Sequence, residues 1–293
     1  MCDSIISTAV IPAAGMGTRL LPATKAIPKE LLPVVDTPAI QYITNEIVES
    51  GINKIIFITA KGKEAIIDHF DSSPDLEWNL ESRGNTRMLE QVRYPSDMAK
   101  FIAVRQDKPL GLGHAIGRAE PFVQGDAFAV VLPDDLIDSS VPVLKQLLDV
   151  YDKFKPSAVF ALMKVSRSDT SKYGIISGTE LESGIFQVDD MVEKPEPQNA
   201  PSDYAVIGRY ILNRKIFSYI EETRLGSGGE VQLTDALKLM LKDGGRVMGV
   251  TFDGLRFDTG DVSGYIQANI NYALKRPELE ATLRNGLSKL LND

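Results

Sequence analysis

The stretch Val10-Ile11-Pro12-Ala13-Ala14-Gly15-Met16-Gly17-Thr18-Arg19-Leu20 decides the fold class of this chain. The β-rich run at 8–13 predicts a strand that ends in a loop of small residues. Small residues let the backbone approach a ligand closely, and open α/β sheets bind ligands at the carboxyl edge of their strands. The stretch therefore predicts an α/β sheet with a binding loop at that edge.

Strand-like and helix-like segments alternate on either side of this loop. Further β-rich runs lie at 54–60, 101–106 and 128–132, and helical apolar spacing occurs at 40–50, before Gly51, and at 63–70. Strands that are apolar on both faces suit the middle of a parallel sheet that helices cover on both sides. The first half is predicted to be doubly wound.

The second half has a more mixed pattern. Strands are predicted at 158–165, 173–177, 185–192 and 204–212, more as a meander than as βαβ units, with a surface loop at 195–201. Helices are predicted at 215–224, 233–242 and 262–275. The tail at 278–291 carries leucines mostly on one face. We expect it to pack as a helix on its own domain, with a subunit contact as the alternative.

Composition narrows the class of protein. The chain has 293 residues, 43% hydrophobic and 25% charged, with a net charge of −8, which does not favour a broad nucleic-acid surface. A few local cations can still form a pocket for a small phosphorylated substrate. No apolar run reaches the length of a membrane span, and no basic segment suggests a signal peptide. The single cysteine excludes an internal disulfide, so we expect a cytoplasmic protein.

The glycine loop differs from two familiar phosphate-binding loops. Leu20 stands where the dinucleotide fingerprint needs a third small residue, and the Walker A lysine is absent. Instead, Arg19, Lys25 and Lys29 lie within eleven residues, on a segment that contains several prolines. A guanidinium fork and a compact ammonium both suit phosphate oxygens. The segment is therefore predicted to bind phosphate.

Two acidic motifs suggest a metal site. Asp134 and Asp135 follow the apolar strand at 128–132, and Asp258 opens an Asp-Thr-Gly turn. Mg²⁺ is usually held by one or two carboxylates together with substrate phosphates. Adjacent residues of a strand point to opposite sides, so only one of Asp134 and Asp135 is expected to face the site. The residues alone leave that choice open.

At these motifs the chain resembles the sugar-nucleotide pyrophosphorylases. Their Gly-x-Gly-Thr-Arg-Leu-x-Pro and Pro-Lys-x-Leu-Leu-Pro patterns occur here, and the match continues in order through 109–115, 132–135, 192–195, 228–235 and 257–260. The longer strings look most like the bacterial members that use UTP and glucose 1-phosphate. The resemblance implies a Rossmann-like mixed sheet with added sugar-binding strands and a C-terminal helix. It also implies a single domain over 1–293, with nucleotide (1–135), sugar-phosphate (136–265) and C-terminal (266–293) parts.

The resemblance also implies a role for individual residues. Asp134 and Asp258 would hold Mg²⁺, Arg19 would stabilise the leaving pyrophosphate, and Lys29 and Lys194 would contact phosphates. The nucleotide would lie against Ala13, Ala14, Gly15, Gly17, Thr18, Glu30, Gln106 and Gly111. The sugar would lie against Gly174, Glu193, Lys194 and Gly208. His114 could be taken for a general base, but the reacting phosphate oxygen is already anionic, so His114 is expected to be structural.

Three alternatives remain at this stage. A related enzyme could use dTTP, although the thymidylyl relatives carry glutamine where this chain has Glu30. A non-catalytic protein could bind the sugar nucleotide as a regulator, and a degenerate dinucleotide-dependent dehydrogenase is the third. The expected partners are UTP and glucose 1-phosphate, without nucleic acid or membrane. The leucine-bearing tail makes a homodimer or homotetramer the expected assembly.

Overall fold

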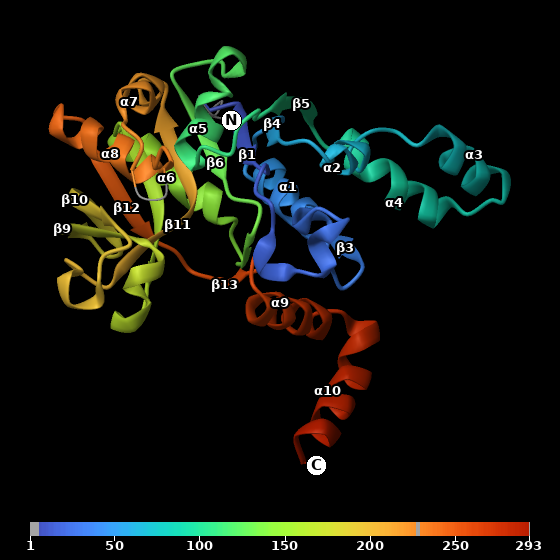
Figure 1. The fold of residues 1–293 in the computed structure, drawn as a ribbon. Coiled ribbons are helices and arrows are strands. Elements are labelled where there is room, and N and C mark those ends of the chain that lie inside the picture. Colours follow the sequence, from blue (N-terminus) through green and yellow to red (C-terminus); the bar gives the residue numbers. More distant parts are fainter. Residues whose placement is uncertain (1–5, 227–228, 293) are drawn as a thin grey trace.

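Nine strands of the described residues join one mixed sheet. The computed structural model describes residues 6–226 and 229–292 (Figure 1). The strands run across the sheet in the order β5-β4-β1-β6-β11-β8-β12-β10-β9. Their bounds are β1 Thr8–Pro12, β4 Lys54–Thr59, β5 Lys100–Arg105, β6 Ala127–Val131, β8 Ala158–Lys164, β9 Gly174–Glu182, β10 Ile185–Glu193, β11 Tyr204–Asn213 and β12 Val247–Thr251.

The first half is doubly wound, as predicted. Strands β5, β4, β1 and β6 are parallel neighbours, so their carboxyl ends meet at one edge of the sheet. Successive residues of β1 enter opposite cores: Val10 packs on one face of the sheet, and Ala9 and Ile11 pack on the other. This alternation requires helices on both sides, because each face would otherwise expose its apolar side chains.

Helices cover both faces of the sheet. The core that contains Ile11 also receives α1 (Ala39–Glu49), α6 (Val143–Phe154) and Ala268 of α9 (Val262–Leu274). The core that contains Val10 receives α5 (Leu112–Gly117), α7 (Ile216–Glu222) and α8 (Leu233–Lys242). Helix α1 ends at Glu49, and Gly51 follows with a φ of +89°, the left-handed conformation that ends helices.

The second half is not the meander that its strand pattern suggested. Only β9 and β10 form a hairpin of sequence neighbours, while β11 lies between β6 and β8 and is antiparallel to both. Strand β12, which we did not predict, lies parallel to β8. Strand β11 is buried along most of its length, and burial on both faces gives a strand an interior place that local pattern does not reveal.

Two short ladders stand outside the main sheet. Strand β13 (Leu255–Asp258) pairs antiparallel with β7 (Asp135–Asp138), which places Asp258 opposite Asp135. Strand β2 (Pro33–Val34) pairs with β3 (Thr37–Pro38). Helix α2 (Glu64–Asp68) follows β4, and α3 (Pro74–Ser82) with α4 (Thr86–Asp97) forms an arm that extends away from the sheet (Figure 1). The β13–β7 ladder brings the two predicted acidic motifs together.

The expectation that the leucine-bearing tail packs on its own domain is wrong. Helix α10 (Pro277–Asn292) leaves the body after α9 and projects from it (Figure 1). Leu290 and Leu291 are 77% and 82% exposed. A one-sided leucine pattern shows that a helix has an apolar face, but it does not say what covers that face.

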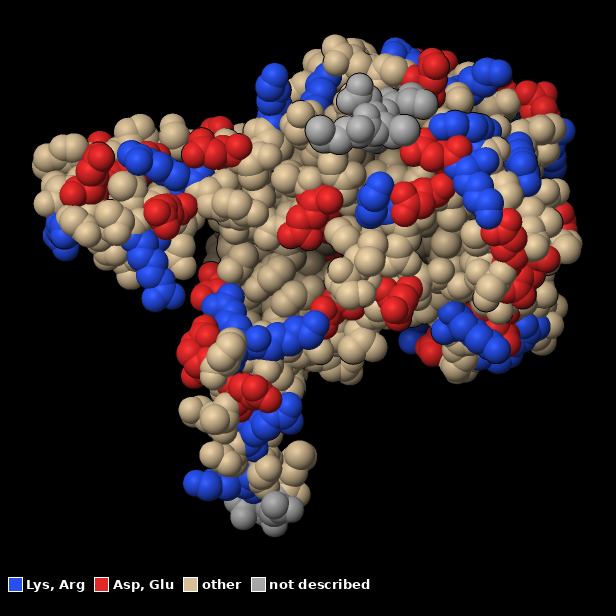
Figure 2. Space-filling view, turned by 180° about the vertical axis from the view of Figure 1, so that it is seen from behind, with Lys and Arg blue, Asp and Glu red and all other residues tan. Residues whose placement is uncertain are grey.

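The surface carries charges of both signs. In Figure 2, which views the molecule from behind, lysines and arginines are interspersed with aspartates and glutamates over the body, the arm and α10. A continuous basic surface is therefore missing from the face that Figure 2 shows.

Among the described residues, no helix combines the length and apolar composition needed to span a membrane.

A buried ion pair joins helix α1 to the sheet. Arg209 of β11 is fully buried and contacts both carboxylate oxygens of Glu46, at 2.9 and 2.6 Å. It also donates to the carbonyl oxygen of Asp135 at 2.7 Å. The same guanidinium therefore supports the turn that carries the acidic pair.

We expect Arg209→Met to lower the free energy of unfolding by about 3–5 kcal/mol, because the mostly buried Glu46 carboxylate would lose its cationic partner and keep only the N–H of Leu144. Arg284→Met is the matched control, since Arg284 forms an exposed pair with Glu280, and its effect should stay within about 1 kcal/mol. Urea unfolding followed by circular dichroism measures both. Equal effects from the two substitutions would contradict a structural role for the buried pair.

Candidate active site

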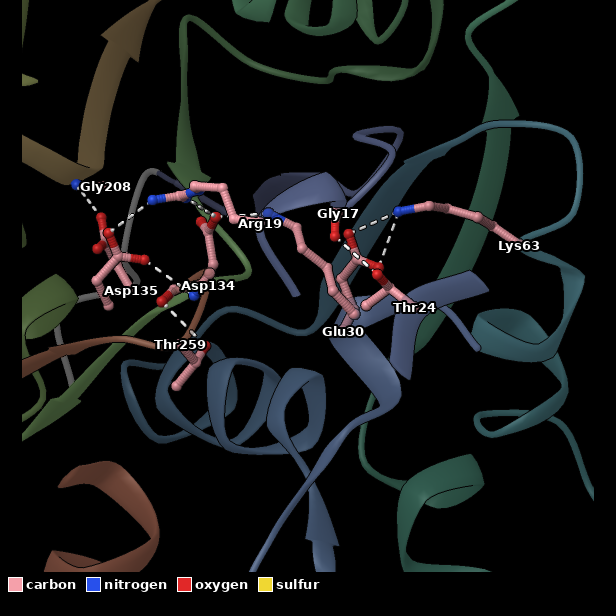
Figure 3. A network of polar contacts seen from close by, with 12 residues as sticks. Gly17, Arg19, Thr24, Glu30, Lys63, Asp134, Asp135, Gly208 and Thr259 are labelled. Atoms are coloured by element: carbon pink, nitrogen blue, oxygen red, sulfur yellow. Dashed lines mark hydrogen bonds and ion pairs between the residues drawn. The ribbon is translucent and has the colours of Figure 1, made fainter. Parts of the chain in front are cut away.

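The glycine loop after β1 packs directly onto the cation-bearing segment. Gly17 has a φ of +68°, and a Cβ placed on it would lie 3.2 Å from the Cβ of Lys29. The Thr24 hydroxyl donates to the carbonyl oxygen of Gly17 at 2.7 Å (Figure 3). A side chain at position 17 would therefore be strained and would also crowd Lys29. The loop conformation and the position of Lys29 depend on each other.

The two predicted cations meet the two predicted carboxylates. The Nζ atom of Lys29 lies 2.6 Å from Oδ2 of Asp134, and the Arg19 guanidinium lies 3.8 Å from Asp134 and 3.4 Å from Asp258. Figure 3 shows Arg19 extending over Asp134. The Arg19 side chain is 57% exposed, whereas Lys29 and Asp134 are mostly buried. Of these two cations, Arg19 is therefore the more exposed.

The ion pair changes the pKa values of both partners. Burial lowers the pKa of Lys29, but the Asp134 and Glu30 carboxylates together outweigh burial and leave that pKa above its ordinary value. Burial raises the pKa of Asp134, but Lys29, a backbone hydrogen bond and Arg19 together outweigh it and leave that pKa below its ordinary value. Both groups therefore stay charged at neutral pH.

Asp134 and Asp258 face one small space. A Cβ placed on Gly260 would lie 2.8 Å from Oδ2 of Asp134, 2.9 Å from Oδ1 of Asp258 and 2.5 Å from Nη2 of Arg19. The N–H of Thr259 donates to the carbonyl oxygen of Asp134 at 2.8 Å, which ties the two acidic turns together. The carboxylates come from positions more than a hundred residues apart and converge where only a glycine fits.

Asp135 has different partners from Asp134. Its Oδ2 accepts from the N–H of Gly208 at 2.9 Å, and its Oδ1 accepts from Arg256 Nε at 2.7 Å (Figure 3). Arg256 also donates to the Tyr173 hydroxyl at 3.1 Å. Both oxygens of Asp135 are thus used by the protein itself. This geometry favours Asp134 as the carboxylate available to a metal ion.

The carboxylates line a cleft of about 930 Å³. Arg19, Lys194, Gly208 and Asp258 contribute to its wall. Lys194 adopts a positive φ of +46°, which is uncommon for a non-glycine residue and is typical of functional sites. The protein thus brings Lys194 to the cleft from the end of β10, and Lys172 and Arg256 are further cations in its wall.

A smaller hollow of about 150 Å³ adjoins this cleft, and Leu132, Tyr173 and Tyr210 line both. Gly174 and Glu193 contribute to the hollow, and the Thr234 hydroxyl donates to Oε2 of Glu193 at 2.6 Å. The residues predicted to contact a sugar therefore lie around these two adjoining spaces. Their hydroxyl, carboxylate and backbone groups suit a polyhydroxylated ligand.

A third hollow of about 300 Å³ lies beside the glycine loop. Ala14, Gly15, Gln106 and Gly111 line it. Leu112 lines both this hollow and the smaller sugar-side one, so the two hollows lie on either side of the same residue. Four residues of the predicted nucleotide set do not line this hollow. The N–H of the buried Ala13 donates to the carbonyl oxygen of Ile58, Thr18 is exposed, and Gly17 and Glu30 are the other two.

Glu30 does not lie on the surface of these hollows. Its carboxylate is fully buried and accepts from Lys63 Nζ at 2.7 and 2.8 Å (Figure 3). Burial raises the pKa of Glu30 and lowers the pKa of Lys63, and the attraction between the two groups opposes both shifts. Glu30 follows Lys29 directly, so its buried pair anchors the segment that carries the catalytic candidate.

Sequence reasoning missed three residues of the site: Lys63, Arg256 and Thr234. Lys63 follows the carboxyl end of β4, where open α/β sheets bind ligands, so its position could have suggested it. Arg256 stands two positions before Asp258 and therefore shares its strand face, which could have suggested Arg256 as well. Thr234 lies on α8, and no local pattern links it to Glu193.

Comparison with known proteins agrees with this geometry. The nucleotidyl transferase family matches residues 8–275. The chain is 46% identical over 287 residues to the UTP–glucose-1-phosphate uridylyltransferase of Bacillus subtilis, covering 98% of each chain. A relative from Staphylococcus epidermidis with the same name is 45% identical, with 97% and 98% coverage.

Solved structures agree as well. A UDP-glucose pyrophosphorylase complexed with UDP-glucose is 43% identical with a TM-score of 0.83, covering 92% of this chain and 100% of that one. A UTP-bound enzyme of the same kind from Acinetobacter baumannii is 38% identical with a TM-score of 0.89, covering 97% and 99%. A glucose-1-phosphate thymidylyltransferase from Bacillus anthracis is more distant, at 27% identity and a TM-score of 0.71. These matches cover nearly the whole chain and agree with the geometry of the site, so the protein belongs to the nucleotidyl transferase family.

Proposed function

We propose that this protein forms UDP-glucose and pyrophosphate from UTP and glucose 1-phosphate. One observation carries the proposal: Arg19 and Lys29 meet Asp134 and Asp258 at a cleft that adjoins a sugar-sized hollow, and a third hollow lies beside the glycine loop. The relatives with this name and the structures that hold UDP-glucose or UTP support the same assignment.

The proposed chemistry is an in-line displacement at phosphorus. An oxygen of glucose 1-phosphate forms a bond to the α-phosphorus of UTP, and the bond from that phosphorus to the bridging oxygen of pyrophosphate breaks. Both reactants are polyanions, so orientation and charge neutralisation supply most of the catalysis. Arg19 would neutralise the leaving pyrophosphate, and Lys29 and Lys194 would hold the phosphate groups in place. No covalent enzyme intermediate is needed.

Asp134 and Asp258 would hold a magnesium ion. Two carboxylates that line one cleft are protein ligands of the kind that Mg²⁺ takes together with substrate phosphates. When bound, the ion would add positive charge next to the reacting phosphates. Glu193 would accept hydrogen bonds from sugar hydroxyls, and the backbone at Gly174 and Gly208 would border the hexose.

We propose one catalytic domain, with residues 1–135 mainly on the nucleotide side and 136–265 mainly on the sugar-phosphate side. The glycine loop and Gln106 come from the first part, and Glu193, Lys194 and Gly208 come from the second.

We place the protein in the cytoplasm, since its one cysteine fits a reducing compartment.

A pyrophosphate-release assay tests the proposal. UTP and dTTP should each be offered with glucose 1-phosphate and galactose 1-phosphate, with and without Mg²⁺. We expect the highest kcat/KM with UTP, glucose 1-phosphate and Mg²⁺. Higher kcat/KM with dTTP would assign the thymidylyl reaction instead. Binding without release of pyrophosphate in any combination would indicate a regulator.

Arg19→Ala should lower kcat by roughly 10²–10³, the scale expected for losing one group that stabilises charge in the transition state. The control is Arg284→Ala on the projecting helix, which should leave kcat unchanged. Steady-state kinetics at saturating substrate measures both. A kcat close to that of the unmodified protein in Arg19→Ala would refute the proposed role of Arg19.

Asp134→Ala should remove magnesium-dependent activity, because one of the two proposed metal ligands is lost. Asp152→Ala is the control, since Asp152 is an exposed residue of α6 paired with Lys155. Magnesium titration with pyrophosphate release as the readout compares the variants. Full magnesium-dependent activity in Asp134→Ala would show that Asp134 is not a required ligand.

Gly260→Ala should lower kcat by roughly 10², since the new methyl group must displace both carboxylates and Arg19 from their positions. The displaced atoms are the ends of side chains, so we expect the melting temperature to change little. Gly286→Ala on α10 meets nothing within 4 Å and should change neither quantity. Unchanged kcat in Gly260→Ala would contradict the proposed convergence of the carboxylates.

We further propose that the protein self-associates as a homodimer or homotetramer through its exposed apolar side chains. Leu290 and Leu291 on α10, and Trp78 at 70% exposure on the α3–α4 arm, are candidates for that contact. Sedimentation velocity should show an oligomer, and Leu290→Glu with Leu291→Glu should shift it toward the monomer. A monomer in the unmodified protein would refute this proposal.

A further inference from the structure

The side chain of Gln106 lines the hollow beside the glycine loop at the end of β5. The residue is only 7% exposed, and its N–H donates to the carbonyl oxygen of Thr59 at 2.8 Å, which fixes its backbone to the end of β4. Its amide therefore enters the hollow from a rigid support. The direction in which that amide points decides what the hollow can recognise.

Two neighbours determine the orientation of the amide. The Nε2 atom lies 3.3 Å from the carbonyl oxygen of Gly111 and 2.9 Å from Nδ1 of His114. A carbonyl oxygen can only accept a hydrogen bond, so the NH₂ end of the amide must face Gly111. The second amide hydrogen then points to Nδ1 of His114, which must accept it. That contact requires an Nδ1 without a proton, as in the tautomer that carries its hydrogen on Nε2.

This arrangement leaves the carbonyl end of the amide available. Both hydrogens of Nε2 are used, while Oε1 accepts no hydrogen bond from the residues that the structure describes. Oε1 is also not among the buried polar atoms that lack a partner. Gln106 therefore presents an accessible hydrogen-bond acceptor to the hollow and no free donor.

His114 itself is held in place. It lies in α5, where the N–H of Gly113 donates to the carbonyl oxygen of Val231 at 2.9 Å, and the N–H of Val231 donates to Leu110 at 2.7 Å. A Cβ placed on Gly113 would lie 2.8 Å from both the side chain and the carbonyl oxygen of Val231. Helix α5 is thus packed against the segment around Val231, which fixes the backbone that carries the imidazole.

Pyrimidine bases differ in the group that such an acceptor meets. Uracil carries a hydrogen on N3, which is a donor, whereas N3 of cytosine is an acceptor. A fixed carbonyl oxygen matches the first and opposes the second, and a site built around such a bond rejects a mismatched base strongly. An amide free to turn over would present its NH₂ group and accommodate either base.

We propose that His114 is a positioning residue that selects uracil over cytosine by locking the amide of Gln106. The proposal rests on the proposed function, which places the base of UTP in this hollow. His114 touches neither reacting phosphate nor metal ligand; it acts through Gln106. The expected consequence of losing its acceptor atom is a change in base discrimination and in KM for UTP, with little change in kcat.

Two variants of matched shape test this role. In His114→Asn, Oδ1 occupies about the same position as Nδ1 and can accept the amide hydrogen, whereas His114→Leu places a methyl group there. We expect His114→Leu to raise KM for UTP and to lower the ratio of kcat/KM for UTP over CTP by roughly tenfold, the scale of one hydrogen bond. His114→Asn should retain the ratio of the unmodified protein. Unchanged discrimination in His114→Leu would overturn the proposal.

Calorimetric binding of UTP and CTP separates this proposal from the proposed function. If the unmodified protein binds UTP in preference to CTP but releases no pyrophosphate, the proposed function fails and the binding ratio of the variants still tests His114. Equal binding of UTP and CTP by the unmodified protein would overturn the selection.

A measurement on the unmodified protein complements the variants and does not depend on their folding. The chain has only two histidines, so the ¹⁵N resonances of the His114 ring are readily assigned with a His69→Gln variant. We expect the neutral tautomer with its proton on Nε2 and an unprotonated Nδ1. A proton on Nδ1 would overturn the proposal, because the amide could not donate to that atom.

Discussion

The ion pair between Lys29 and Asp134 is the contact on which the site depends. It joins the loop segment after β1 to the carboxyl end of β6, and Arg19 extends the same charge cluster to Asp258. Opposite charges placed this close hold the cleft together without a ligand. A phosphate group that enters the cleft can then replace the carboxylates as the partner of these cations, because it carries more negative charge than a carboxylate does. The resting charges thus prepare the site for polyanionic substrates.

The fold supplies this contact by aligning chain segments at one edge. Parallel strands β1, β4, β5 and β6 end together, so their following residues surround one space. The β7–β13 ladder then brings Asp258 to that edge. Gly208 and Arg256 donate to the two carboxylate oxygens of Asp135, so Asp135 has different partners from Asp134. The buried Arg209–Glu46 pair supports the same turn from below. Structural charges thus hold the proposed catalytic charges in position.

Recognition of the two substrates has a different physical basis from the phosphate chemistry. Cations and carboxylates act on charge, which nucleoside triphosphates share, and so they do not distinguish one base or sugar from another. Hydrogen-bonding groups with fixed direction can do so, such as the Gln106 amide on one side and the Glu193 carboxylate, held by Thr234, on the other. Glu30 has a different role from these recognition groups. Its buried pair with Lys63 anchors the chain segment that carries Lys29.

The sequence by itself determined the doubly wound first half, the glycine loop and the identity of the cations and carboxylates, because strand periodicity and residue chemistry are local properties. Tertiary structure decided what depends on distant partners. It placed β11 between β6 and β8, separated the roles of Asp134 and Asp135, buried Glu30 against Lys63 and left α10 projecting from the body. A local pattern shows that a side chain needs a partner of a given kind, but only the packed chain shows which partner comes within reach.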